Sequence, residues 1–147
     1  MKIKTTFAII SLFILVVGLT FNAPAYNNTT NSAEKLIYQG KFHSASKRGS
    51  GTASVYEAKG GKRILKLTNL NTSSGPDLFI YIFKKNDADS SRELRNVEYV
   101  NLGRLKSSKG NHEYEIPEGV DLESFRAVSV WCKEFGVNFT TASISKV

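Results

Sequence analysis

The chain has 147 residues, a formal net charge of +7 and a single cysteine. One cysteine excludes an internal disulfide, so a hydrophobic core must hold the fold without covalent crosslinks. The two histidines lie outside any metal-ligand spacing, and no nucleic-acid motif accompanies the scattered basic residues, so we expect neither a metal site nor a nucleic-acid partner.

The first 25 residues have the three-part pattern of a secretory signal peptide. Lys2 and Lys4 precede an apolar stretch over residues 7–21, and Ala23 and Ala25 place small residues at the −3 and −1 positions of a cleavage site. The apolar stretch is about 15 residues long, shorter than the roughly 20 that span a bilayer. We therefore expect the signal peptide to be cleaved and the chain to be exported to the periplasm, the cell surface or the medium. After cleavage we expect no membrane-spanning segment. If uncleaved, the same segment would tether the chain to a membrane.

The mature chain, residues 26–147, is expected to form one domain. Residues 26–35 begin with a polar, low-complexity run and are predicted to be a flexible linker before a domain over residues 36–147. Without Lys2 and Lys4 the net charge is +5, and the excess is spread along the chain. Such a distribution favours weak contact with anionic surfaces over one specific groove.

The first half of the domain is predicted to be strands divided by turns. Residues 36–42 form the first expected strand. Residues 52–57 and 63–70 are then predicted to form a hairpin around Gly60-Gly61. The stretch LFIYIF at residues 78–83 is apolar at every position, which indicates a central strand buried on both faces.

The second half begins with a charged stretch. Residues 84–98 are predicted to be a surface loop with one helical turn near residues 90–94. Further strands are expected over residues 99–102, 111–116 and 125–132, followed by a C-terminal strand that ends near residue 145. About eight short strands without a long helix predict an all-β fold, an antiparallel β-sandwich or flattened barrel.

The chain has few signs of enzymatic chemistry. Gly60-Gly61-Lys62 lacks the upstream glycine of a phosphate-binding loop, and there is no Gly-x-Ser-x-Gly motif or suggestive pair of carboxylates. We therefore do not expect a stand-alone enzyme.

Cys132 is the exception. Strand alternation places it on the face of Val128 and Val130, opposite Trp131. Three interpretations stay open: a small buried hydrophobe, a thiolate made reactive by a cation such as Lys133, or an axial ligand for haem iron. A lone thiol also permits a disulfide-linked dimer.

Two further residues are candidates for a site. Gly75-Pro76 forms a rigid turn into the buried strand, where Asp77 is expected to bond backbone amides; alternatively it orients a ligand or accepts a proton beside the thiol. Tyr81 lies on that strand and is expected in the core with its hydroxyl hydrogen-bonded.

The order and spacing of several short motifs resemble the DM-thirteen domain family over about residues 36–144. The matching pieces are Gly40-x-Phe42, Ser50-Gly51-Thr52-Ala53, Leu65-x-Leu67, Thr72-Ser73-Ser74-Gly75-Pro76-Asp77-Leu78, LFIYIF, Tyr99-Val100-Asn101-Leu102-Gly103-x-Leu105-Lys106, Gly110-Asn111-x-x-Tyr114-Glu115-Ile116-Pro117 and Val128-Ser129-Val130-Trp131-Cys132-x-x-Phe135-x-Val137-x-Phe139.

The resemblance implies an all-β sandwich that acts in electron transfer. It implies that Cys132 is a redox thiol or the ligand of a prosthetic group, for which haem is the candidate. We predict Trp131 and Tyr81 as further cofactor-binding residues and Asp77 as a supporting residue. The resemblance also implies a redox partner protein or a cell-surface protein as the partner. The chain departs from the family at Lys47, where many members have a histidine. The alternative function is a non-catalytic extracellular binding module in which the cysteine is structural.

Overall fold

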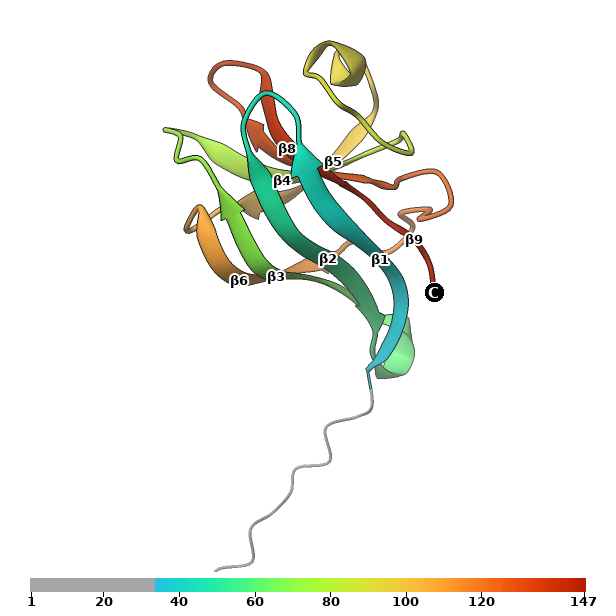
Figure 1. The fold of residues 1–147 in the computed structure, drawn as a ribbon. Coiled ribbons are helices and arrows are strands. Elements are labelled where there is room, and N and C mark those ends of the chain that lie inside the picture. Colours follow the sequence, from blue (N-terminus) through green and yellow to red (C-terminus); the bar gives the residue numbers. More distant parts are fainter. Residues whose placement is uncertain (1–33) are drawn as a thin grey trace, which may run out of the picture.

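The computed structural model describes residues 34–147, which form an all-β domain (Figure 1). The expected signal peptide, residues 1–25, and the expected linker up to residue 33 lie outside the described residues. The strands are β1 (Lys35–Ser44), β2 (Gly49–Glu57), β3 (Arg63–Thr72), β4 (Leu78–Phe83), β5 (Tyr99–Arg104), β6 (Lys109–Ile116), β7 (Ala127–Cys132), β8 (Val137–Ser143) and β9 (Ser145–Lys146), and two 3-10 turns are η1 (Lys59–Gly61) and η2 (Arg92–Leu94).

The strands form one antiparallel path that folds into a flattened barrel. Its order is β5-β4-β7-β8-β1-β2-β3-β6, with β9 paired to β1. The long strand β1 joins the two layers, because its first part pairs with β2 while residues 42–44 pair with β8. The edge strands β5 and β6 nearly close the barrel, and the Tyr114 hydroxyl donates to the backbone oxygen of Arg104 across the gap (3.2 Å). The predicted sandwich or flattened barrel is confirmed.

The hydrophobic core lies between the two layers. Leu65 and Leu67 of β3 point inward and are buried, as the alternation of that strand predicts. Ile80 and Ile82 of β4 meet them from the other layer. The strand β4 lies between β5 and β7, so the prediction of a central buried strand is confirmed.

The long connection between β4 and β5, residues 84–98, packs two of its side chains against the outer face of the sheet. Its Ala88 and Leu94 are buried against Tyr81, Phe83 and Ala127 on the outer face of the sheet. This explains why β4 is apolar at every position: one face belongs to the barrel core and the other lies under this loop. The expected helical turn is present as η2.

A buried polar group fixes β7 and β8 to the same loop. The Asn138 side chain accepts a hydrogen bond from the Ser129 hydroxyl (2.7 Å) and donates to the Thr141 hydroxyl oxygen (2.8 Å). The backbone amide of Asn138 donates to Ser91 Oγ of the loop (2.9 Å). These bonds satisfy polar atoms whose burial would otherwise be unfavourable.

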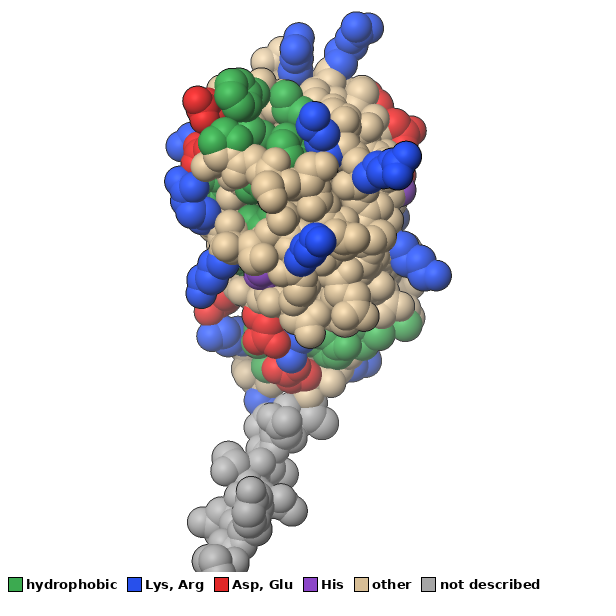
Figure 2. Space-filling model, turned by 60° about the vertical axis from the view of Figure 1, so that its left-hand side comes forward, with side chains coloured by type: hydrophobic (Ala, Val, Ile, Leu, Met, Phe, Trp, Pro, Cys, Tyr) green, Lys and Arg blue, Asp and Glu red, His purple; other side chains and the backbone are tan. Residues whose placement is uncertain are grey.

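On the face seen in Figure 2, lysine and arginine side chains are spread out with acidic side chains among them, and they form no continuous stripe. No helix within residues 34–147 is long and apolar enough to cross a membrane. The same residues contain no group of three or more His, Cys, Asp or Glu side chains placed to hold a metal ion.

Candidate functional site

Cys132 is the last residue of β7 and lies inside the barrel. It is 0% exposed and packs in the main hydrophobic core. In the sheet its neighbours are Leu78 on β4 and Val137 on β8. The side chain lies on the same face as Val130, as the alternation of the strand predicts.

The loop that leads into β4 lies against the core beside Cys132. The Lys133 amide donates to the Asp77 carbonyl oxygen (2.9 Å), which ties this loop to the end of β7. Gly75 packs so tightly that an added Cβ would lie 2.9 Å from Leu78 Cδ2 and 3.0 Å from Phe139 Cζ. A side chain at this position would therefore force Leu78 and Phe139 to shift, so the turn packs closely against the core.

The Asp77 side chain forms an ion pair instead of the expected backbone cap. Its Oδ1 lies 2.6 Å from an Arg104 guanidinium nitrogen at the end of β5. The Arg104 guanidinium also lies over the Phe79 ring, 5.0 Å from its centroid. The pair is partly exposed, so its contribution to stability is modest, but it joins the turn to an edge strand.

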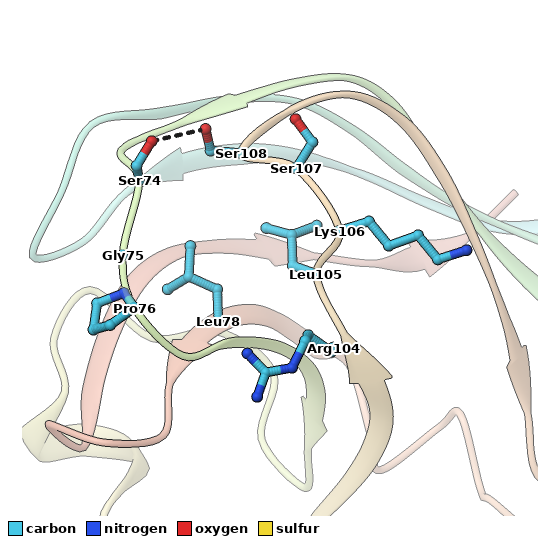
Figure 3. Close-up of a pocket in the computed structure, with 9 residues that line it drawn as sticks. All are labelled: Ser74, Gly75, Pro76, Leu78, Arg104, Leu105, Lys106, Ser107 and Ser108. Carbon is cyan, nitrogen blue, oxygen red and sulfur yellow. Dashed lines mark hydrogen bonds between the residues drawn. The ribbon is translucent and has the colours of Figure 1, made fainter.

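A cleft of about 320 Å³ opens between this turn and residues 104–108 (Figure 3). The side chains of Leu78 and Leu105 point toward each other across it, and the Lys106 side chain extends away (Figure 3). At its rim the Ser74 and Ser108 hydroxyls are hydrogen-bonded (3.2 Å), which links the two loops.

A second hollow of about 470 Å³ lies on the other side of the Ser74–Pro76 turn. Phe135, Val137 and Phe139 supply its apolar wall, and Phe135 is 64% exposed. The Lys47 ammonium, which also lines this hollow, lies 6.0 Å from the centroid of the Phe139 ring. Cys132 lines neither the hollow nor the cleft.

These observations test whether Cys132 fits a haem group. An axial thiolate ligand needs an open space beside the sulfur for a porphyrin. Cys132 is fully buried, and Leu78 and Val137, its neighbours in the sheet, line the cleft and the hollow in its place. The residues present therefore do not fit a haem held by Cys132.

Trp131 and Tyr81, the other expected cofactor-binding residues, lie together on the opposite, outer face of the sheet. Their ring centroids are 6.3 Å apart with an interplanar angle of 17°. Tyr81 is 3% exposed and packs in the smaller buried cluster under the loop over residues 84–98. Burial, with smaller contributions from Tyr99 and Asp77, raises the pKa of Tyr81.

The aromatic group extends beyond Trp131 and Tyr81, the two members predicted from the sequence. Phe79 and Phe83 flank Tyr81 on the same face, and Tyr99 of β5 stacks on Tyr81 with centroids 4.5 Å apart. The signal was present in part, because aromatic residues stand at alternate positions of β4. We call Phe79, Tyr81, Phe83, Tyr99 and Trp131 the aromatic cluster.

His43 lies four residues before Lys47 and contacts the loop over residues 84–98. Its Nε2 is 2.7 Å from Asp87 Oδ1, and its Nδ1 is 3.5 Å from Asp89 Oδ1. Burial lowers the pKa of His43, but the hydrogen bond to Asp87 and weaker contributions from Ser44 and Asp89 outweigh it, so the net shift is upward. His43 therefore joins β1 to this loop.

The family model described as Electron transfer DM13 matches residues 41–144, which include Asp77, Tyr81, Trp131 and Cys132. No curated protein and no solved structure matches the chain.

Proposed function

Because the chain belongs to the electron transfer DM13 family, we propose that it is an exported electron-transfer module that serves a redox partner protein and is not a stand-alone catalyst. The observation that carries this proposal is the family match, which spans nearly all of the described domain. Fold alone would not support it, because β-sandwiches and barrels serve many functions.

The redox group in this proposal is the Cys132 thiol. The thiolate attacks a disulfide of the partner, a new sulfur–sulfur bond forms to Cys132, and the partner's second sulfur leaves and takes up a proton. Cys132 is thereby oxidised to a mixed disulfide with the partner, and the partner's leaving sulfur is reduced to a thiol. Since the sulfur is 0% exposed, this step requires the Gly75-Pro76-Asp77 turn to move away from the core.

The test compares residues 26–147 with the Cys132→Ala variant. Each is incubated with oxidised glutathione in native buffer, and adduct formation is followed by mass spectrometry. The proposal predicts one glutathione per native chain and none on the variant. It also predicts faster adduct formation in Asp77→Ala, which removes the ion pair to Arg104 and loosens the turn. Adducts that form only in urea would overturn the thiol mechanism.

A second candidate function is a non-catalytic extracellular binding module with a structural cysteine. Full burial of Cys132 among apolar side chains favours it, since buried free cysteines behave as small hydrophobes. In that case the exposed Phe135 hollow or another surface would contact the partner. The same glutathione experiment separates the two functions, because this one predicts an inert native thiol.

Export is a separate part of the proposal. It rests on the sequence pattern of residues 1–25, ending at Ala23-Pro24-Ala25. Expression of the full chain in a bacterial host, followed by cell fractionation and N-terminal sequencing, should recover a chain that begins at Tyr26 outside the cytoplasm. A full-length chain that stays in the membrane fraction would indicate a tether instead.

A further inference from the structure

A third hollow lies on the outer face of the sheet, away from the Cys132 thiol. It has a volume of about 380 Å³, within the range typical of small-molecule sites. One wall is formed by four members of the aromatic cluster, and the other by residues 94–97 of the loop before β5. Lys133, just after β7, completes the lining. We call this hollow the aromatic cleft.

Three rings of the aromatic wall are nearly parallel, an arrangement on which a flat ligand can stack. Tyr99 and Tyr81 are 4.5 Å apart at an interplanar angle of 7°, and Tyr81 and Trp131 are 6.3 Å apart at 17°, so three rings lie nearly parallel. Phe83 packs at a tilt against both Tyr99 and Trp131 and holds the ends of this row. Tyr99 is 51% exposed, which leaves ring surface open to a further flat group.

The charged groups at the aromatic cleft are positive. Arg95 and Lys133 both line it, and neither has an ion-pair partner in the part of the chain that the structure describes. The Lys133 ammonium lies 5.7 Å from the centroid of the Phe79 ring, which places it beside the aromatic cluster. Such a cation attracts an anionic group while the rings contact its apolar part.

No acidic residue among residues 34–147 lines the aromatic cleft, and two glutamates of the loop over residues 84–98 are each paired with a lysine. Glu98 lies 2.9 Å from Lys84, and Glu93 lies 3.0 Å from Lys85. Neither glutamate lines the aromatic cleft. Tyr81 also lines the cleft, and a tyrosine hydroxyl can donate a hydrogen bond to an oxygen acceptor.

We propose that the aromatic cleft binds a planar aromatic molecule that carries an anionic group. The ring of the ligand stacks on the exposed Tyr99 ring, which continues the row formed with Tyr81 and Trp131, and its anionic group faces Lys133 and Arg95. The site is separate from the Cys132 thiol and does not depend on the proposed redox function.

The test titrates residues 26–147 with anthraquinone-2-sulfonate by isothermal calorimetry. Quenching of the fluorescence of Trp131, the one tryptophan of the chain, gives a second readout at the site itself. Saturable binding that weakens with added salt is expected. Cyclohexanesulfonate, which has the anion without the flat ring, should bind at least tenfold more weakly.

Three variants locate the binding. Tyr99→Ala removes the exposed ring of the row and should weaken binding at least tenfold. Lys133→Glu reverses an exposed charge and should weaken it several-fold and remove most of the salt dependence. Phe135→Ala, an exposed aromatic residue at the other hollow, is the matched control and should bind like the unaltered chain. Circular dichroism checks that each variant is folded.

Absence of binding up to millimolar anthraquinone-2-sulfonate would overturn the proposal. If folded Tyr99→Ala and Lys133→Glu bound the ligand as tightly as the unaltered chain does, the proposal would also be wrong. Loss of binding in Phe135→Ala would place the ligand at the other hollow and would overturn it as well. Cys132→Ala should retain full affinity. A failure of the glutathione experiment therefore leaves this site unaffected, and the two proposals are tested independently.

Discussion

Trp131 and Cys132 are consecutive residues of β7, yet their side chains lie on opposite faces of the sheet. The Cys132 thiol is in the barrel core, whereas the Trp131 indole packs in the aromatic cluster outside it. The Trp-Cys motif therefore belongs to two environments. One is apolar and closed, and the other is aromatic, positively charged and open to solvent. Chemistry at the thiol and binding at the indole need separate experiments.

Replacement of Cys132 measures how apolar its surroundings are. Cys132→Ala should lower the free energy of unfolding by about 1–2 kcal/mol, because it removes one buried atom from a packed core. Cys132→Ser should cost about 1 kcal/mol more, because its hydroxyl would be buried among apolar groups. Urea denaturation of residues 26–147 measures both values. Equal stability of the two variants would mean that a polar partner lies near the thiol.

The buried side chain of Asn138 should be among the most sensitive positions of the domain. Asn138→Ala leaves the Ser129 hydroxyl without its acceptor and the Thr141 hydroxyl without its donor. We expect a loss of about 3 kcal/mol in the free energy of unfolding, measured by urea denaturation. The exposed Asn101, which bonds only the Gly103 amide, is the control, and Asn101→Ala should cost less than about 1 kcal/mol. Similar losses for both would contradict this account.

Much of the strand pattern could be predicted because local periodicity carries it. The bounds of Leu78–Phe83 agree with the prediction, and the inward side of β3 follows from alternation at Leu65 and Leu67. The buried positions of the loop over residues 84–98 were harder to predict. Its buried residues, Ala88 and Leu94, are widely spaced in a charged stretch and follow no period. Their burial is decided by a sheet face that distant strands build.

In the candidate site too, some features follow from local sequence and others depend on strands that are distant in the sequence. The face of Cys132 follows from alternation within one strand, which is local information. The partner of Asp77 depends on the pairing of Phe79 with Arg104, which the register of β4 and β5 sets. That ladder contains an irregularity between Ile80 and Tyr81, so a sequence pattern could not place Tyr99 against Tyr81.

Gly40 should tolerate no side chain. A Cβ at this position of β1 would overlap the backbone carbonyl oxygen of Ser143 and lie 3.0 Å from the amide nitrogen of Ile144. Backbone atoms cannot rotate away, so Gly40→Ala should lower the free energy of unfolding by about 3 kcal/mol or more. Thermal unfolding followed by circular dichroism measures the change.

The control for this substitution is Gly60→Ala. An added Cβ there meets no atom within 4 Å, and the positive φ of 83° accounts for a cost of about 1 kcal/mol. An equal effect at the two positions would show that backbone conformation, and not close approach, decides the outcome at Gly40.

The contact of His43 with Asp87 should make stability depend on pH. Burial lowers the pKa of His43, but the hydrogen bonds to Asp87 and Ser44 and the charges of Asp87 and Asp89 together raise it above its ordinary value of 6.5. The folded state therefore binds this proton more tightly than the unfolded state does. The stabilisation is complete below pH 6.5 and is lost as the pH rises through the folded-state pKa. Urea denaturation at pH 5.5 and 8.5 should give the higher free energy of unfolding at pH 5.5 from this group.

The His43→Gln variant isolates the contribution of His43 to the pH dependence of the free energy of unfolding. The difference between the two pH values should shrink in this variant and in Asp87→Asn, because each removes the charged pair. An NMR titration of the unaltered domain should place the midpoint of His43 above 6.5. Asp89, 3.5 Å from Nδ1, contributes in the same direction, so Asp89→Asn should lower that midpoint by less than Asp87→Asn does. A midpoint at or below 6.5 would show that desolvation dominates and that the contact between β1 and the loop does not depend on the proton.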